Sequence, residues 1–232
     1  MHKKNVEVTV GSAIAAFLEE CGVKTAFGVI SIHNMPILDA FGGTNMADSY
    51  ARTTGELGVC LTSTGTAAGN AAGAMVEALT AGTPMLHITG QIESQYLDQG
   101  LSYIHEAPDQ LTMLEAVSKA AFRVRSAETA LSTIKHAVQI AMTAPTGPVS
   151  VEIPIDIQGA LISMPTDLRP LEVPVYQPSE ASLDRLAERL LQAKRPLLWL
   201  GGGARHAGQA VQRLMKMGFC VVTSTQGRGI VP

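Results

Sequence analysis

The apolar pattern predicts a strand, a turn, a helix and a second strand within residues 59–91. Val59 to Ser63 is a short β-favouring run that leads into the turn Thr64-Gly65-Thr66, whose glycine can adopt a positive φ. The stretch from Ala67 to Ala81 predicts a helix made largely of small residues, and Met85 to Thr89 is apolar enough to be a buried parallel strand. Because small residues let backbones approach closely, we expect this helix to lie in a tightly packed interior or at a subunit contact.

Helices and strands alternate on both sides of this central unit. Upstream, apolar residues fall on one helical face, with Thr9 or Ser12 available as the cap and Gly22 beyond the end. That face consists of Val10, Ala13, Ile14, Phe17, Leu18 and Cys21. The other predicted elements are a strand at 25–29, a helix from Pro36, a helix at 46–54, a strand at 118–124, a helix capped by Ser126 and a strand at 148–153. This alternation predicts an α/β fold with a doubly wound, mostly parallel sheet and helices on both faces.

A partial second α/β domain is predicted after a proline-rich stretch. Residues 158–180 are rich in proline and lack periodicity, so they predict a linker. Beyond it the pattern predicts a helix at 183–191, a strand at 197–200, a helix at 207–217 and a strand at 219–224. We therefore expect a domain at residues 1–157, a linker at 158–180 and, at 181–232, a truncated domain only two strands into a larger sheet.

The junction before the helix at 46–54 departs from the alternating pattern. Only Gly42-Gly43-Thr44-Asn45 separates this helix from the one that begins at Pro36. An alternating chain should place a strand and two loops there, roughly 10 to 18 residues on ordinary lengths. Three explanations stay open: a deleted strand, a segment of the molecule that the sequence omits, or a double glycine that links two helices directly.

Composition limits the partners and the compartment. A net charge of -3, with 16% charged residues, argues against a nucleic-acid surface. Cys21, Cys60 and Cys220 fall singly in apolar surroundings, so we expect buried free thiols in a reducing compartment. No apolar run reaches the roughly 18 residues of a membrane helix, and the polar beginning is not a signal peptide. The expectation is a soluble cytoplasmic protein that binds neither nucleic acid nor membrane.

Common phosphate, metal and nucleophile motifs carry no function here. Gly201-Gly202-Gly203 lies between a predicted strand and a helix, but His206 occupies the position of the last glycine of GxGxxG, so we interpret it as a tight turn. GxxxxGK[ST], HExxH and GxSxG do not occur. The histidines are scattered, and His87, inside a buried strand, is predicted to be structural.

Six blocks, in order, resemble the thiamine-diphosphate-dependent enzymes. The first three blocks are residues 27–40, 46–52 and 64–70, which match the family segments FGVPGxxNLPLLDAL, MADGYAR and SGPGATN. The next two are residues 88–91 and 147–157, which match ITGQV and GPVxxxIPxDV. The sixth is residues 200–204 with 227–232, which match LxGGG and GKGxxP. The blocks occur in the family's order and are spread over nearly the whole chain, so the match is far more specific than any one of them. The resemblance is to the acetolactate-synthase-like enzymes.

The resemblance implies that residues 1–157 bind the aminopyrimidine of thiamine diphosphate and that a central domain follows. In this family the cofactor lies across a dimer interface, and a C-terminal domain with a GDG motif holds the diphosphate and Mg²⁺. GDG does not occur here, so we expect this chain alone to be inactive. The parent protein would be a homodimer or homotetramer, a lyase or transferase that decarboxylates or carboligates a 2-oxo acid. FAD is a further candidate cofactor, because some acetolactate synthases carry it.

Four cofactor-binding residues follow from the resemblance. Val29, ahead of the first loop, and Thr66 and Asn70, in the central turn, would line the pyrimidine pocket. His105 falls near the position of a glutamine that faces the thiazolium in acetolactate synthases, where an imidazole could bind substrate or shuttle a proton. The alternative for His105 is a surface-loop histidine. The family's Pro-Gly is replaced by Ile30-Ser31 in the first loop and by Thr66-Ala67 in the second, so both loops need a different backbone or pocket.

The catalytic glutamate of the family has no counterpart in the sequence. In the family it hydrogen-bonds a pyrimidine nitrogen, so that the adjacent amino group can take the thiazolium C2 proton, and such groups contribute on the order of 10² to 10⁴ in rate. It precedes the helix matched by 46–52, but no glutamate occurs between Phe41 and Met46. Glu56 lies beyond that helix and is interpreted as a solvated surface charge. We therefore nominate no catalytic residue and no metal ligand.

Two other function classes stay open. A non-catalytic α/β binding or scaffold protein would explain the missing glutamate, and it predicts no binding of thiamine diphosphate. A flavin or nicotinamide oxidoreductase would use the second region, and it predicts a yellow protein or a bound nucleotide.

Overall fold

The computed structural model describes residues 6–28 and 41–231. The chain forms two compact units that divide between Val175 and Tyr176. Each unit is described by itself. In the described residues no helix is both long enough and apolar enough to cross a membrane.

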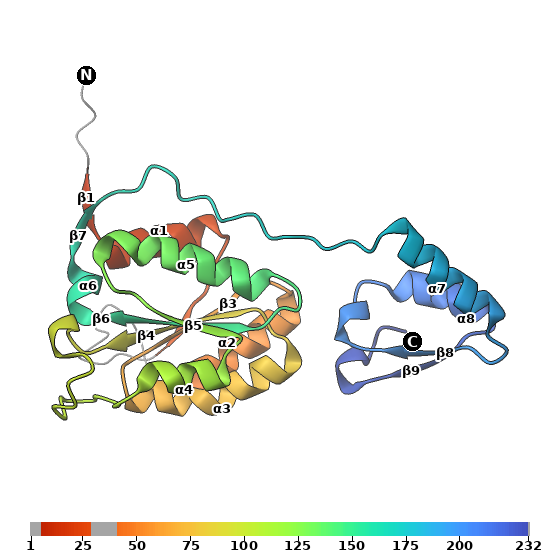
Figure 1. Ribbon diagram of the computed structural model, residues 1–232, viewed down its shortest axis with the longest axis horizontal. Coiled ribbons are helices and arrows are strands. Elements are labelled where there is room, and N and C mark those ends of the chain that lie inside the picture. The colour runs from red at the N-terminus through yellow and green to blue at the C-terminus, as the bar shows by residue number, and fades with distance from the viewer. Residues whose placement is uncertain (1–5, 29–40, 232) are drawn as a thin grey trace, which may run out of the picture. The chain divides into compact units, whose positions relative to one another are not determined.

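The first unit is built on a five-stranded sheet in which every strand pairing is parallel (Figure 1). In sheet order its strands are β2 (Phe27–Gly28), β3 (Gly58–Thr62), β4 (Met85–Gln91), β6 (Pro148–Pro154) and β5 (Ala120–Arg123). The central strands β4 and β6 are buried along their whole length. Both faces of the sheet are covered, so the polar residues of these strands, such as His87 and Ser150, are buried together with the apolar ones.

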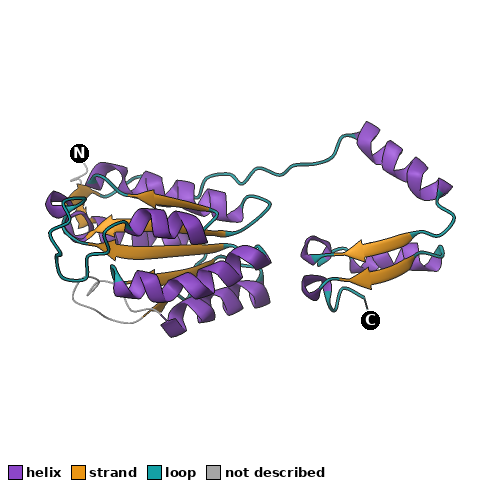
Figure 2. Ribbon diagram, turned by 60° about the horizontal axis from the view of Figure 1, so that its bottom comes forward, coloured by secondary structure: helices purple, strands orange, loops and turns teal. Residues whose placement is uncertain are grey.

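Helices cover both faces of this sheet (Figures 1 and 2). One face carries α1 (Val10–Glu20) and α5 (Ala127–Met142), and the other carries α2 (Phe41–Thr54), α3 (Thr66–Ala81) and α4 (Gln110–Val117). The large core cluster lies between α1, α5 and the sheet, and it includes Phe17, Ile134 and Val151. On the opposite face a smaller cluster joins α2, α3 and the sheet. The predicted doubly wound α/β fold is confirmed.

The ends of α1 and α3 follow the local sequence signals. The Thr9 side chain caps α1 by accepting a hydrogen bond from the Ser12 N–H at 3.1 Å. Helix α3 ends at Gly82, whose φ of 67° is left-handed, as a glycine C-cap requires. Ser126 occupies the N-cap position of α5, but its side chain makes no capping hydrogen bond there. The position of the N-cap of α5 was thus predicted correctly, but the Ser126 side chain does not form the capping hydrogen bond.

Several elements were not predicted. Strand β1 (Glu7–Thr9) pairs antiparallel with β7 (Leu161–Ser163), so part of the proline-rich stretch is a strand. Helix α6 (Ile155–Gly159) and helix α4 were not predicted either, although Asp109 caps α4 by accepting a hydrogen bond from the Thr112 N–H. Helix α2 begins at Phe41, so the residues Gly42 to Asn45, interpreted as a junction, lie within its first turn. The strand predicted at 25–29 is described only at Phe27–Gly28, and the helix predicted from Pro36 falls outside the described residues.

The second unit has the predicted alternation of helix and strand. It contains α7 (Glu180–Gln192), β8 (Leu197–Leu200), α8 (Gly208–Lys216) and β9 (Cys220–Thr223), and the two strands pair in parallel. A short 3-10 helix at Gly202–Ala204 lies between β8 and α8, where Gly201-Gly202-Gly203 was interpreted as a tight turn. Cys220 is exposed and Cys21 is half-buried, so the expectation that all three thiols are buried is correct only for Cys60.

Candidate functional site

The carboxyl ends of the parallel strands meet at one edge of the sheet, where the turn after β3 leads into α3. Gly65 stands at the N-cap of α3 with φ 57° and ψ -100°, and no side chain caps this helix. Thr66 and Asn70 follow on α3, and both are exposed. They are four residues apart, so they lie on the same face of the helix. This edge is where doubly wound folds bind their ligands.

The loop that carries His105 lies against this turn. A Cβ atom on Gly65 would overlap the backbone carbonyl oxygen of His105. Within this loop Asp98, Ser102 and His105 have positive φ angles of 62°, 56° and 63°. A side-chain-bearing residue in this region is uncommon, so the surrounding structure must fix the loop conformation. His105 itself is exposed.

The structure brings three of the four predicted site residues into one place. Thr66 follows Gly65 directly, Asn70 lies one helical turn further on, and the His105 backbone contacts Gly65. Val29 lies outside the described residues. Glu56 is exposed and accepts a hydrogen bond from the Tyr50 hydroxyl, which confirms its interpretation as a surface charge.

A buried polar network that the sequence analysis missed lies beside the turn. The Oε1 atom of Gln110 accepts hydrogen bonds from the Gly65 N–H at 2.6 Å and from the Thr64 hydroxyl at 3.1 Å. Its Nε2 atom donates to the Gly90 carbonyl at 3.1 Å and to Oε2 of Glu152 at 2.9 Å. The Nε2 atom of Gln91 donates to the same Glu152 oxygen at 3.2 Å. The turn and the ends of β4 and β6 are therefore joined by side-chain hydrogen bonds.

Glu152 is paired with a cation as well as with amides. The Arg123 guanidinium donates to the second carboxylate oxygen, Oε1 of Glu152, and also to both oxygens of Asp98 at 3.0 and 2.8 Å. Glu152 is completely buried, and the side chains of Arg123 and Asp98 are 8% and 66% exposed. A buried carboxylate needs such a partner because it is costly to desolvate alone. Both oxygens of Glu152 are engaged, so this carboxylate is not available to a ligand.

The signal that could have located this network is polarity at the ends of predicted strands. Glu152 is a charged residue inside the apolar run 148–153, and Gln91 ends the run that begins at Met85. Gln110 begins a helix that the sequence analysis did not predict, and the signal that could have located this helix is Asp109, a typical N-cap residue.

His87 lies deeper in the sheet and is structural, as predicted. It is fully buried, and its ring nitrogens hydrogen-bond the Thr62 hydroxyl at 2.9 Å and the Ser150 hydroxyl at 3.0 Å. Burial lowers the pKa of His87 to about 4, because the charged imidazolium would be desolvated. At neutral pH this histidine is uncharged.

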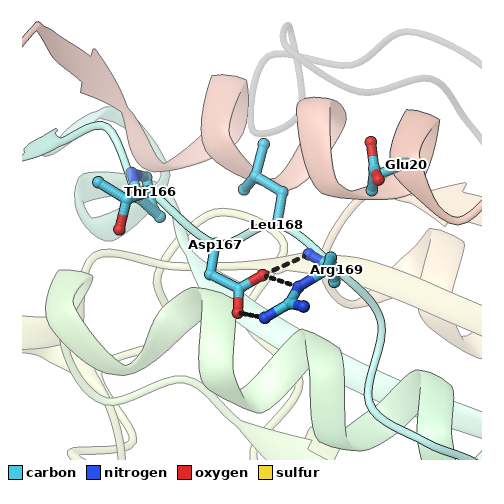
Figure 3. A pocket seen from close by; sticks show the side chains of 6 residues that line it. Glu20, Thr166, Asp167, Leu168 and Arg169 are labelled. Atoms are coloured by element: carbon cyan, nitrogen blue, oxygen red, sulfur yellow. Dashed lines mark hydrogen bonds and ion pairs between the residues drawn. The ribbon is translucent and has the colours of Figure 1, made fainter.

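A separate hollow of about 430 Å³ lies at the Glu20 end of α1 (Figure 3). It is lined by Glu20 and residues Pro165–Arg169, and by none of the predicted site residues. Hydrogen bonds from Arg169 hold the pKa of Asp167 below its usual range. At the other end of α1, the Val10 N–H donates a hydrogen bond to the Ala160 carbonyl, just past the carboxyl end of β6. The Glu20 end of α1, where this hollow lies, is therefore remote from the Gly65 turn. Over residues 6–28 and 41–231, His, Cys, Asp and Glu side chains form no group of three or more that could hold a metal ion.

Comparisons with known proteins show which family this chain resembles. The family described as "Thiamine pyrophosphate enzyme, N-terminal TPP binding domain" matches residues 8–113, a range that holds the Gly65 turn and the His105 loop. The chain is 30% identical to the "Probable 2-ketoarginine decarboxylase AruI" of Pseudomonas aeruginosa, over 97% of this chain and 43% of that protein. It is 35% identical to the acetolactate synthase large subunit of Haemophilus influenzae, over 81% of this chain and 34% of that protein.

A third relative is named as a carboligase. The glyoxylate carboligase of Escherichia coli O157:H7 is 32% identical over 93% of this chain and 39% of that protein. The chain thus spans 34 to 43% of the length of these three relatives. The resemblance seen in the six blocks is confirmed: this chain is related to the acetolactate-synthase-like, thiamine-pyrophosphate-dependent enzymes.

Proposed function

We propose that this chain is the pyrimidine-binding part of a thiamine-diphosphate-dependent enzyme that decarboxylates or carboligates a 2-oxo acid. The observation that carries the proposal is the meeting of the Gly65 turn with the His105 loop, at the strand ends and inside the family match. The domain division proposed with it is a pyrimidine-binding domain at residues 1–157, a linker at 158–180 and the beginning of a central domain at 181–232.

The residues at the turn suit an aminopyrimidine. Such a ring presents nitrogen acceptors and an amino donor, and the Thr66 hydroxyl, the Asn70 amide and the His105 imidazole can both donate and accept hydrogen bonds. Gly65, with no Cβ, lets the loop backbone approach the start of α3 closely. In this proposal Thr66 and Asn70 orient the pyrimidine, and His105 faces the reacting end of the cofactor. Val29 completes the pocket on the basis of the resemblance alone.

Bound thiamine diphosphate would supply the electron sink for the carbon–carbon bond chemistry. The part of this chain is to bind the pyrimidine, to orient it and to exclude water from it. Glu152 is not a substitute for the family's glutamate, because amide and guanidinium groups occupy both of its oxygens. No catalytic glutamate is therefore assigned to this chain.

Further parts of the proposal rest on the resemblance. Another domain of the complete protein would hold the diphosphate and Mg²⁺. The assembly would be a cytoplasmic homodimer or homotetramer, with the cofactor at the interface between subunits. FAD would be a second, structural cofactor.

The test is the affinity of the complete protein containing this chain for thiamine diphosphate with Mg²⁺, measured by calorimetry. Thr66→Val and Asn70→Ala should each weaken binding about 3- to 10-fold, the value of one neutral hydrogen bond. Thr80→Val is the matched control, because Thr80 is also exposed on α3, at the other end of the helix. It should bind as the unaltered protein does.

Each contrary result has a definite meaning. No binding by the unaltered protein would favour a non-catalytic scaffold. A tightly bound nucleotide without any thiamine diphosphate binding would favour an oxidoreductase. Equal losses in Thr66→Val and Thr80→Val would show that the turn is not the binding site.

A further inference from the structure

Gln110 has a more demanding set of contacts than an ordinary core amide. It is 1% exposed, begins α4, and makes four side-chain hydrogen bonds to three segments of the chain. Two of these bonds go to the turn itself, through the Thr64 hydroxyl and the Gly65 N–H. The bond to Gly65 is the shorter, at 2.6 Å. Gln110 therefore acts directly on the backbone of the turn that precedes Thr66.

We infer that Gln110 is a positioning residue of the cofactor site, which holds the Gly65 turn in the conformation that binds the pyrimidine. This inference rests on the proposed function and deepens it. Gln110 does not touch the ligand. It acts through the backbone of Gly65 and so sets where α3 begins.

The conformation of Gly65 explains why such a residue is needed. Its φ of 57° and ψ of -100° lie outside the regular regions, and α3 has no side-chain cap to fix its first turn. Glycine reaches these angles readily because it has no Cβ, but its own sterics do not hold it there, so its surroundings must fix the turn. The amide oxygen of Gln110 supplies that constraint by accepting the Gly65 N–H.

Glu152 determines which way the Gln110 amide points. The Nε2 group faces two acceptors, the Gly90 carbonyl and the Glu152 carboxylate. If the amide were reversed, its NH₂ group would face the Gly65 N–H, and its oxygen would face these two acceptors. All those hydrogen bonds would be lost, so only one orientation of the amide is stable. The buried carboxylate thus presents the oxygen of Gln110 to the turn.

The same carboxylate also anchors the loop on the other side of the turn. Arg123 links Glu152 to Asp98, and Asp98 belongs to the loop that carries His105. Hydrogen bonds and ion pairs therefore connect both sides of the candidate site, the turn and the loop, to Glu152. A substitution at Gln110 should therefore remove the hydrogen bonds that hold the turn, while Arg123 still connects the loop to Glu152.

The test compares Gln110→Met with Gln158→Met. Gln158 is 4% exposed and donates one hydrogen bond, to the Ile153 carbonyl rather than to the turn, so it controls for the loss of a buried amide of the same size. We expect Gln110→Met to weaken thiamine diphosphate binding by the complete protein about tenfold, and Gln158→Met to leave it unchanged. In the ligand-free 232-residue chain, amide hydrogen exchange at Gly65 should become at least about tenfold faster in Gln110→Met than in Gln158→Met.

The outcomes separate this inference from the proposed function. If the unaltered protein does not bind thiamine diphosphate, the proposed function fails and the inference fails with it. If the unaltered protein binds and Gln110→Met binds equally well, the inference alone is overturned. Equal losses of affinity in Gln110→Met and Gln158→Met would also overturn it, because they would reflect general stability. Unchanged exchange at Gly65 in Gln110→Met would show that the amide does not hold the turn.

Discussion

The backbone carbonyl of His105 lies so close to Gly65 that a Cβ atom at Gly65 would overlap it. This contact joins the turn after β3 to a loop that begins after β4, and it depends on the absence of a side chain. It also explains why the turn keeps a glycine although the residues after it differ from the family pattern. The turn and the loop of the candidate site are thus brought together by a close approach of their backbones.

Gly65→Ala should destabilise the first unit by about 3 kcal/mol or more. About 1 to 2 kcal/mol comes from the positive φ, and the remainder comes from the overlap with His105. Gly55→Ala is the matched control, since Gly55 has a φ of 78° but open space at its Cβ position. Gly55→Ala should lower the free energy of unfolding only by the contribution of the positive φ, about 1 to 2 kcal/mol. Urea unfolding measures both values, and equal losses would mean that the His105 loop yields without cost.

Stability should depend on pH through His87. The folded-state pKa of about 4 lies below the value of 6.5 for an unfolded chain, so the unfolded state binds more protons between these two pH values. The contribution of His87 is complete above pH 6.5 and is lost as the pH falls towards 4, by about 1.4 kcal/mol per pH unit. The measurement is urea unfolding between pH 4 and pH 8 for the unaltered chain and for His87→Asn. The difference between the two curves should be flat above pH 6.5 and should shrink below it, and parallel curves throughout would contradict the prediction.

Arg123→Met should destabilise the chain by about 3 to 5 kcal/mol, because it leaves the buried Glu152 carboxylate without its cation. Asp98→Asn should cost no more than about 1 kcal/mol, because the Asp98 side chain is largely exposed. Chemical denaturation of both variants gives the comparison.

The double variant Arg123→Met with Glu152→Gln isolates the charge effect. It should be more stable than Arg123→Met alone, because the unpaired charge is gone. A double variant less stable than Arg123→Met would indicate that packing, rather than charge, accounts for the role of Arg123.

The three thiols should react at different rates. Burial raises the pKa values of Cys21 and Cys60 to about 11, so both stay protonated at pH 8, whereas Cys220 is exposed. A thiol reagent such as Ellman's reagent should label one cysteine rapidly in the native 232-residue chain and all three in denaturant. Cys220→Ser should remove the rapid phase. Rapid labelling of Cys60 in that variant would mean that α2, whose Thr44 hydroxyl contacts the Cys60 sulfur at 3.0 Å, opens readily.

Local pattern predicted those elements whose apolar residues carry a clear period. Strands β3, β4 and β6 and helices α1, α3 and α5 lie close to their predicted ranges. The pattern failed for β1 and β7, which are three residues long and gain their structure only by pairing with each other across the chain. It also failed for α2, which begins at Phe41 although its first turn contains two glycines, residues of low helix propensity.

The sequence by itself determined the alternation of the main helices and strands, the doubly wound fold class and the relation to thiamine-pyrophosphate enzymes, because local periodicity and contiguous motifs encode these features. Only the tertiary structure decided how the site is held. The bonds from Gln110 to Gly65 and to Glu152 join residues 45 and 42 positions apart. No local pattern encodes such a contact, because it forms only when the parallel strands bring their carboxyl ends to one edge of the sheet.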